Sequence, residues 1–323
     1  MKRLSRRRKN VINTVKVEEQ TVIDAEDFET SVHLFLRDRK IKNLSEHTLK
    51  YYRTELFGTM RQLERQGVDT HPSKITDKTI KENVILDLMD AGRKETTINA
   101  RLRALRSFFG FLSDEGMIAQ NPFDDVGLIK QHKGIIQTFT REQLREILGQ
   151  ADQGTFTGVR DYTLMLLMVE TGARVREVCD ITINDIRWED NQIKLNGKGA
   201  KDRLVPFQKT MKRQLRKYMA VRGHVSVTDI LFVNIDDKPL SRRRVQEIVA
   251  KYGRMANIKN VRCSPHTFRH TFAKIAVQNG ADVFALQAML GHTSLEMVRN
   301  YVNLFSSDVF EKHKHFSPVE NLF

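Results

Sequence analysis

The stretch SPHTFRHTFA, residues 264–273, holds a dense group of chemically active side chains. If it forms a helix, His266, Arg269 and His270 stand at offsets of three and four and therefore share one face. Two histidines four residues apart on a helix can hold zinc, whereas an arginine between them suits a phosphate. The neighbouring residues decide between these two interpretations.

Zinc does not suit this stretch. A helical zinc site of the metalloprotease kind reads His-Glu-x-x-His, but the second position here is Thr267. Arg269 is always charged and would repel a divalent cation. No Cys, Asp or third His stands at ligand spacing nearby, and Cys179 and Cys263 form no zinc pattern. We therefore expect no metal and interpret Arg269 as a phosphate-binding residue.

Four further segments of the second half carry candidate residues. Arg174 lies in TGARVREV with Glu177 three residues on, and Lys198 lies in GKGAK. His292 lies in LGHTS, and Tyr301 follows nine residues later. Each has a structural alternative: an ion pair for Arg174, a solvated lysine, a helix cap and a core tyrosine. Singly, these alternatives are favoured, but together the residues indicate one phosphate site.

Two common phosphate sites do not match the pattern. A P-loop requires G-x-x-x-x-G-K-[ST], and NGKGAKDR lacks both that spacing and the hydroxyl after the lysine. A two-metal nuclease requires carboxylates to hold its ions, whereas these residues are basic apart from Glu177. The remaining interpretation is phosphoryl transfer without a cofactor, in which protein cations stabilise the developing charge.

Such a reaction accounts for the residue types. Two arginines can hold the non-bridging oxygens of a phosphodiester transition state through forked donors. A lysine on a flexible hairpin can give a proton to the leaving 5′ oxygen. A tyrosine can attack phosphorus, but its phenol pKa of about 10 requires a base or a cationic pocket, which histidines help to form. The phosphotyrosyl product stores the bond energy, so no ATP site is needed.

In chain order, TGARVREV, GKGAKDRLVPF, HTFRHTFA, LGHTS and the tyrosine nine residues on resemble the tyrosine recombinase (phage integrase) family, over residues 28–305. The resemblance implies that Tyr301 is the nucleophile and that Glu177 and His270 support the site. It also implies that a set of five residues surrounds the scissile phosphate: Arg174, Lys198, His266, Arg269 and His292. Arg176 departs from the small polar residue often found at its position and would add a phosphate contact.

The resemblance also implies a reaction and an assembly. Four protomers, two on each site, would hold paired core sites in double-stranded DNA and exchange strands through a Holliday junction. Each cleavage would leave a 3′-phosphotyrosine and a 5′-hydroxyl, and an accessory recombinase or directionality factor is a further expected partner. Because only about 25 residues precede the first predicted helix, we expect a simple-site recombinase or a transposase of a mobile element.

Helices are predicted to position most of these residues. Apolar periodicity of the helical kind runs from about residue 28 to Gly116, and Ser45 is a natural helix cap. In the second half, QIKLN and RLVPF flank a glycine-rich turn, which is typical of a β-hairpin. The expected fold is mainly α and multidomain, with a helical SAM-like core-binding domain and an α+β catalytic domain holding a small antiparallel sheet. The predicted parts are a basic flexible arm (1–25), the core-binding domain (26–118), an interdomain linker (119–138), the catalytic domain (139–305) and a tail (306–323) that would dock onto a neighbouring protomer.

The composition favours a nucleic-acid partner. The 323 residues include 54 Lys and Arg against 40 Asp and Glu, a net charge of +14 that attracts polyanions. No apolar run approaches the roughly 20 residues of a membrane span, and no apolar segment follows the basic start as it would in a secretory signal. We therefore expect no membrane partner and a cytoplasmic location.

Two groups of arginines are candidates for DNA contact outside the catalytic set. Ser241 is predicted to cap a helix in SRRRVQEIVAKYGRM, whose first turn would hold Arg242, Arg243 and Arg244. Positive charge at a helix start opposes the helix dipole, so its presence favours phosphate or guanine contacts over a solvated basic turn. A similar but weaker case is the set Arg101, Arg103 and Arg106.

Two functions of other classes stay open at this point. One is a non-catalytic DNA-binding or architectural protein, which would bind DNA without strand transfer. The other is a type IB topoisomerase-like enzyme, which would relax DNA through the same tyrosine chemistry without exchanging partners. The pathways open to a recombinase are integration, excision, transposition and chromosome-dimer resolution.

Overall fold

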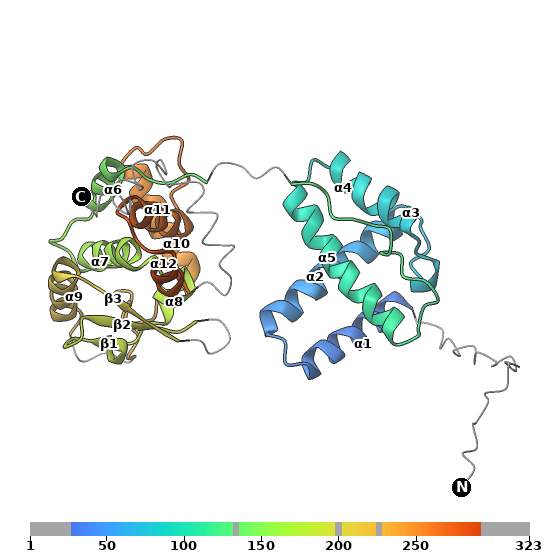
Figure 1. Cartoon of the computed structure of the whole chain (residues 1–323), viewed down its shortest axis with the longest axis horizontal. Helices are drawn as coiled ribbons and strands as arrows, with labels where there is room; N and C mark the ends of the chain where they lie inside the picture. The colour runs from blue at the N-terminus through green and yellow to red at the C-terminus, as the bar shows by residue number, and fades with distance from the viewer. Residues whose placement is uncertain (1–26, 132–135, 198–201, 224–227, 292–323) are drawn as a thin grey trace, which may run out of the picture. The chain divides into compact units, whose positions relative to one another are not determined.

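The computed structural model describes residues 27–131, 136–197, 202–223 and 228–291. The chain divides into two compact units, Met1–Gly134 and Ile135–Phe323. Both units are built mainly from helices, and the second also holds a small antiparallel sheet (Figure 1). The predicted fold class is therefore confirmed.

The first unit is built around three helices that pack against one another: α1 (Phe28–Ile41), α2 (Glu46–Arg65) and α5 (Glu95–Asp114). Ser45 caps α2 as predicted, because its hydroxyl accepts a hydrogen bond from the Thr48 N–H at 3.3 Å. Phe35 of α1 and Phe108 of α5 are fully buried, and their rings meet edge to face with centroids 5.7 Å apart. Aromatic burial of this kind holds the unit together.

The helical segment between residues 77 and 90, within the region of predicted helical periodicity, departs from α geometry in its middle. After the 3₁₀ turn η1 (Pro72–Lys74), α3 (Asp77–Thr79) continues as the π-helical segment η2 (Ile80–Leu86) before α4 (Asp87–Asp90). Gln62 of α2 donates to the Asn83 and Val84 carbonyls at 2.9 and 3.3 Å, and Gln66 donates to the Asn83 carbonyl at 2.9 Å. Side-chain donors entering from another helix are a recognised cause of such departures.

The chain leaving α5 stays against the first unit for some distance. Phe123 and Val126 are buried in the core of that unit. The Asn99 side chain bonds both backbone groups of Ile129, its amide donating to the carbonyl and its oxygen accepting from the N–H, each at 2.8 Å. Much of the segment expected to link the domains is thus fixed to the first of them.

In the second unit, the strands of the sheet follow one group of helices in the sequence and precede another. Its elements are α6 (Arg141–Gly149), α7 (Phe156–Thr171), α8 (Val175–Asp180), η3 (Ile183–Asp185), β1 (Ile186–Arg187), β2 (Gln192–Leu195), β3 (Arg203–Pro206), α9 (Lys209–Arg222), α10 (Arg242–Met255), α11 (Pro265–Gln278) and α12 (Val283–Leu290). The strands pair antiparallel in the order β1-β2-β3, with Ile193 opposite Val205. The predicted hairpin of QIKLN and RLVPF is therefore confirmed.

Helix α7 lies at the centre of the second unit and packs against α6, α9 and α11. Its sequence is apolar on most sides, which suits a helix with neighbours all round. It ends at Gly172, whose φ of 61° is left-handed, a conformation that glycine adopts readily. Arg160 and Asp161 are charged residues of this helix, and both are almost fully buried.

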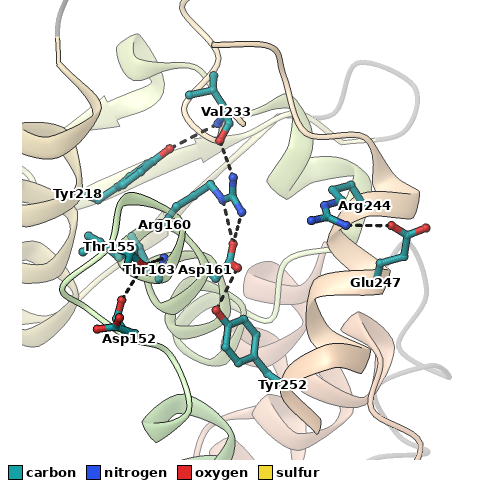
Figure 2. Close-up of polar contacts among 12 residues, drawn as sticks. Asp152, Thr155, Arg160, Asp161, Thr163, Tyr218, Val233, Arg244, Glu247 and Tyr252 are labelled. Atoms are coloured by element: carbon teal, nitrogen blue, oxygen red, sulfur yellow. Dashed lines mark hydrogen bonds and ion pairs between the residues drawn. The ribbon is translucent and has the colours of Figure 1, made fainter. Parts of the chain in front are cut away.

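A buried polar network ties α7 to α10 (Figure 2). Arg160 forms an ion pair with Asp161, with 2.7 Å between Nη2 and Oδ1, and also donates to the Val233 carbonyl at 3.1 Å. Asp161 in turn accepts a hydrogen bond from the Tyr252 hydroxyl of α10 at 3.1 Å. Burial, followed by the Asp161 charge, raises the pKa of Tyr252 to about 12. The network fixes the position of α10 relative to the central helix.

Among the described residues, none forms a helix of the length and apolar character that crossing a membrane would require.

Candidate active site

Arg174 stands at the junction between α7 and α8. It is the N-cap residue of α8, two positions after the left-handed Gly172. Its backbone N–H donates to Glu177 Oε2 at 2.7 Å, and its guanidinium Nη1 donates to Glu177 Oε1 at 2.9 Å. Both the backbone and the side chain of Arg174 are therefore oriented by one carboxylate. The structural alternative considered from the sequence, pairing with Glu177, is thus present in the fold.

Arg269 joins the ends of two helices from its position on α11. Its side chain is buried, with Nη1 donating to the Gly172 carbonyl and Nη2 to the Leu290 carbonyl, both at 2.7 Å. A Cβ at residue 172 would overlap the ring of Phe272, so the close packing of α7 on α11 requires glycine there. Arg269 therefore lies beside the Arg174 segment and the end of α12.

The two arginines converge on adjacent peptide groups at the end of α12. Arg174 Nη2 donates to the Gly291 carbonyl at 3.2 Å, one residue beyond the Leu290 carbonyl that Arg269 contacts. The last carbonyls of a helix carry partial negative charge and have no partner within the helix, so cationic donors are favoured there. The two carbonyls that these guanidinium groups contact belong to the residues directly before His292 in the sequence.

Glu177 is the anionic centre of the site. It is 3% exposed and accepts hydrogen bonds from Arg174 and from both terminal nitrogens of Arg203, the latter two at 2.9 Å. Burial alone would raise the pKa of Glu177, but the hydrogen bonds and charges of Arg203 and Arg174 outweigh it and hold that pKa below its ordinary value. Glu177 is therefore a carboxylate at neutral pH.

The two histidines of the opening motif lie in the first turns of α11, where Ser264 is the N-cap. His266 is exposed and His270 is half-buried. Burial lowers the pKa of His270, and the nearby His266 and Arg269 lower it further. His270 is accordingly neutral at pH 7 and able to accept a hydrogen bond. The predicted common face of His266, Arg269 and His270 follows from the helix, which the structure confirms over this stretch.

Three predicted residues, Lys198, His292 and Tyr301, lie outside the described residues. The described chain stops at residue 197 before Lys198 and at Gly291 before His292. Strands β2 and β3 flank the turn that contains Lys198, and α12 leads directly to His292. In the part of the chain that is described, no three His, Cys, Asp or Glu side chains are grouped where they could hold a metal ion.

The basic turn at the start of α10 is exposed to solvent. Ser241 caps the helix as predicted, with its hydroxyl accepting from the Arg244 N–H at 3.2 Å. Arg243 and Arg244 both pair with Glu247 one turn on, at 3.1 and 3.3 Å, and Figure 2 includes the second pair. Such exposed pairs contribute little to stability. The three arginines, including Arg242, therefore stay candidates for DNA contact.

The arginines of α5 differ from one another. Arg101 is mostly buried and bonds within the first unit, to Glu55 and Gln62, both at 2.9 Å. Arg103 and Arg106 are both exposed, and Arg106 also donates to the Val126 carbonyl. These contacts give Arg101 and Arg106 a role in the fold, and a DNA contact by any of the three stays a prediction.

Arg203 is the residue of this site that the sequence interpretation missed. RLVPF predicts a strand, and a strand prediction alone gives its first residue no place in the site. In the structure, Arg203 forms a forked pair with Glu177 and donates from Nε to the Met289 carbonyl at 2.8 Å. The available signal was a charged residue beginning a strand directly after the glycine-rich turn, but its partners are distant in sequence.

Comparison with known proteins assigns both units to domains of phage integrases. Residues 137–307 match the phage integrase family, and residues 33–116 match the phage integrase N-terminal SAM-like domain. Tyrosine recombinase XerD of Staphylococcus haemolyticus is 32% identical over 90% of this chain and 99% of its own length. Tyrosine recombinase XerC of Bacillus subtilis is also 32% identical, over 86% of this chain and 93% of its own.

Solved structures share the fold at lower identity. The Tn1549 transposon integrase in complex with circular intermediate DNA has a TM-score of 0.70 at 21% identity, covering 91% of this chain and 99% of that one. A lambda integrase dimer bound to a COC' core site has a TM-score of 0.69 at 20% identity, covering 84% of this chain and 97% of that one. The chain belongs to the phage integrase family of tyrosine recombinases. It is accordingly a DNA strand-transferring enzyme.

Proposed function

We propose that the protein is a simple-site DNA recombinase that cuts and rejoins paired core sites through a 3′-phosphotyrosyl intermediate at Tyr301. The observation that carries this proposal is the convergence of Arg174 and Arg269 on the Leu290 and Gly291 carbonyls, immediately before His292. Two guanidinium groups held at one point suit the non-bridging oxygens of one phosphate.

Arg174 and Arg269 form the phosphate clamp in this proposal. Arg174 uses Nη1 on Glu177 and Nη2 on Gly291, but each terminal nitrogen carries a second N–H, and 36% of the side chain is exposed. Arg269 is more deeply buried and fixes the surrounding backbone as well as contributing positive charge. Both groups would stabilise charge that grows on the phosphate during attack, which is the main source of rate in metal-free phosphoryl transfer.

The bond changes require a nucleophile, an acid and a base. The Tyr301 phenol oxygen attacks phosphorus while its proton passes to a histidine, with His266 or His292 as candidates. The bond from phosphorus to the 5′ oxygen breaks, and Lys198 gives that oxygen a proton. Attack of a partner strand's 5′-hydroxyl on the phosphotyrosine then reverses the steps and restores the tyrosine. His270 supports the site through a hydrogen bond to the phosphate or to a neighbouring group.

The proposed partner is double-stranded DNA with two core sites, bound by four copies of the chain with two copies on each site. The basic charge of the sequence supports a DNA partner, and two structural neighbours were solved with DNA bound, one of them as a dimer on a core site. Arg242, Arg243 and Arg244 would contribute groove or phosphate contacts from the start of α10, with Arg101, Arg103 and Arg106 as weaker candidates. An accessory recombinase or directionality factor would set the direction of exchange.

For the biological pathway we propose integration, excision or transposition of a mobile element. Chromosome-dimer resolution is the competing pathway. The similarity to XerD and XerC favours it, because this chain covers almost the full length of both relatives. Recombination assays with two substrates separate them. One plasmid pair carries the ends of the DNA element around the gene, and the other carries the chromosomal replication-terminus region of the same host.

Nicked duplexes provide the test of the proposed reaction. Cleavage beside a nick releases a short fragment that carries the 5′-hydroxyl, and the phosphotyrosine cannot be resealed without it, so the adduct accumulates. Duplexes from the ends of the element are mixed with wild-type protein and with Tyr301→Phe, then separated on a denaturing gel. We expect a slow protein–DNA band for the wild type alone, and joined product when a partner strand with a 5′-hydroxyl is added. Equal binding by both proteins with no adduct would favour the non-catalytic DNA-binding protein. Relaxation of supercoiled plasmid without joining of two substrates would favour the topoisomerase-like enzyme.

A further inference from the structure

Three arginines donate to three consecutive carbonyls at the end of α12. Arg203 Nε contacts the Met289 carbonyl at 2.8 Å, Arg269 Nη2 the Leu290 carbonyl at 2.7 Å, and Arg174 Nη2 the Gly291 carbonyl at 3.2 Å. Arg174 and Arg269 are the proposed clamp, whereas Arg203 belongs to β3 and has no role in the chemistry outlined above. We propose that Arg203 is a positioning residue, which holds Glu177 and the end of α12 so that Arg174 is free to act on the scissile phosphate. This inference rests on the proposed function.

The contacts of Arg203 use all three nitrogens of its guanidinium. Nη1 and Nη2 donate to Glu177 Oε1 and Oε2, both at 2.9 Å, in the parallel two-bond geometry that suits a guanidinium and a carboxylate. Nε donates to the Met289 carbonyl at 2.8 Å. Only 11% of the side chain is exposed, so it is not available to contact DNA from outside the site. Its role must therefore be exerted through Glu177 and α12.

The charges in this cluster show why a second arginine matters. Glu177 is buried and carries one negative charge, and Arg174 and Arg203 each carry a positive charge. Arg203 supplies the forked partner for Glu177, so this cluster of one carboxylate and two guanidinium groups keeps one net positive charge, which the partly exposed Arg174 can present to a phosphate. Without Arg203, the buried carboxylate would have Arg174 as its remaining partner in this cluster and would draw that guanidinium toward itself.

Arg203 also connects two segments that carry proposed catalytic residues. It begins β3, five residues after Lys198, and its partner carbonyl at Met289 lies three residues before His292. α12 packs against β3, so the contact joins the hairpin strand to the helix end. A Cβ on Gly291 would come within 2.9 Å of Arg203 Nη1, and the φ of 62° at this position is also left-handed. Glycine at 291 therefore permits the guanidinium to lie this close to the chain.

The test compares Arg203→Lys and Arg203→Met with wild type and with Lys194→Met. Lys194 is on β2 of the same hairpin and forms an exposed pair with Asp202 at 2.9 Å, so its replacement controls for removing one positive charge from the hairpin. Single-turnover adduct formation is measured on the nicked duplex, together with the DNA dissociation constant and the unfolding temperature. We expect Arg203→Met to slow adduct formation about 100-fold, as misplacement of a reacting group by about 1 Å does. DNA affinity should change less than about threefold in all variants, and Lys194→Met should cleave at the wild-type rate.

A second substrate separates positioning from a general structural role. A nicked duplex with a methylphosphonate at the scissile position lacks one charged oxygen, so it has less need of the arginine clamp. We expect the rate reduction caused by Arg203→Met to fall below about fivefold on this substrate. Arg203→Lys keeps the charge but not the fork, and it should lie between wild type and Arg203→Met. If Arg203→Met does not fold, the rate of Arg203→Lys on the two substrates tests the positioning role instead.

Two results would overturn the inference while leaving the proposed function intact. Cleavage of the phosphate duplex by a folded Arg203→Met within about threefold of wild type, or by Arg203→Lys at the wild-type rate, would remove the positioning role. An equal rate reduction on phosphate and methylphosphonate would show that Arg203 acts only through stability. In contrast, wild-type protein that binds the duplex but forms no adduct would contradict the proposed function itself, and the positioning role with it.

Discussion

Arg174 and Arg269 donate to consecutive carbonyl oxygens, Gly291 and Leu290, although they come from different helical segments of the second unit. Arg174 precedes α8 and Arg269 lies within α11, so neither helix alone brings them together. The end of α12 provides the common point, because its last carbonyls attract cationic donors. In the proposed reaction, guanidinium groups already held in place by the fold meet the condition for strong transition-state stabilisation.

The clamp predicts a large reduction in rate when either arginine is removed. Arg174→Ala should slow adduct formation on the nicked duplex about 10²- to 10³-fold, the effect typical of removing one transition-state donor. Arg174→Lys should recover only part of this, because lysine cannot make the forked contact. Single-turnover rates at saturating protein provide the measurement, with Arg187→Ala on the exposed side of β1 as a control that cleaves normally. Normal cleavage by Arg174→Ala would refute the clamp.

The lowered pKa of Glu177 predicts that its contribution to the free energy of unfolding depends on pH. Its pKa is below the ordinary value of 4.5 in the folded chain, so its stabilising effect is complete above about pH 4.5 and is lost as the pH falls through the lower folded value. Glu177→Gln should cost about 3–5 kcal/mol near pH 7, because two arginines lose their counter-charge in a buried place. The difference from wild type should shrink as the pH falls below about 4.5.

Urea unfolding of wild type and Glu177→Gln at several pH values tests this expectation. Glu189→Gln, an exposed carboxylate in the same unit, is the matched control and should change stability by less than about 0.5 kcal/mol. A difference for Glu177→Gln that is constant with pH would show that its ionisation is not linked to folding.

Tyr252 is predicted to hold α10 in place through Asp161. Tyr252→Phe removes the 3.1 Å hydrogen bond to a buried carboxylate and should cost about 1.5–3 kcal/mol in unfolding free energy. Tyr162→Phe on α7 is the control, since the Tyr162 hydroxyl has no hydrogen bond among the described residues. Equal stability of Tyr252→Phe and wild type in urea would mean that the network does not fasten the helix.

The arginines in the first turn of α10 are predicted to increase DNA affinity and to lower the stability of the fold slightly. Replacing Arg242, Arg243 and Arg244 together by Gln should reduce the slope of log affinity against log salt by about 0.9 for each phosphate that the turn neutralises. The same change removes positive charge from a helix start, so the unfolding temperature should rise slightly. Lys217→Gln on the exposed side of α9 is the control. An unchanged slope in the triple variant would exclude DNA binding by this turn.

Local features of the fold were predictable from the sequence. Ser45, Thr140 and Ser241 act as helix caps, and Gly172 ends α7, because caps depend on residues within one turn of the chain. The helical position of His266, Arg269 and His270 followed from spacing in the same way. The pairing of Arg174 with Glu177, three residues apart, is likewise a local contact that the sequence offers as a structural alternative.

Features that depend on distant partners were not predictable. Arg203 contacts Glu177 and Met289, which are 26 and 86 residues away, and no local pattern records such contacts. The π-helical segment at Ile80–Leu86 accepts hydrogen bonds from Gln62 and Gln66 at the end of α2, and its own apolar residues predict an ordinary helix. Arg101 was considered for DNA contact because it is basic, and its partners Glu55 and Gln62 became visible only in three dimensions.

The chemical identity of the protein–DNA bond decides whether Tyr301 is the nucleophile. Wild-type protein is reacted with the nicked duplex in excess EDTA, and the adduct is digested with nuclease and trypsin and sequenced by mass spectrometry. We expect an adduct that forms without metal ions and carries its nucleotide on Tyr301, within the tryptic peptide 300–312. A nucleotide on another residue of that peptide or elsewhere, or an adduct that requires a divalent metal, would contradict this expectation.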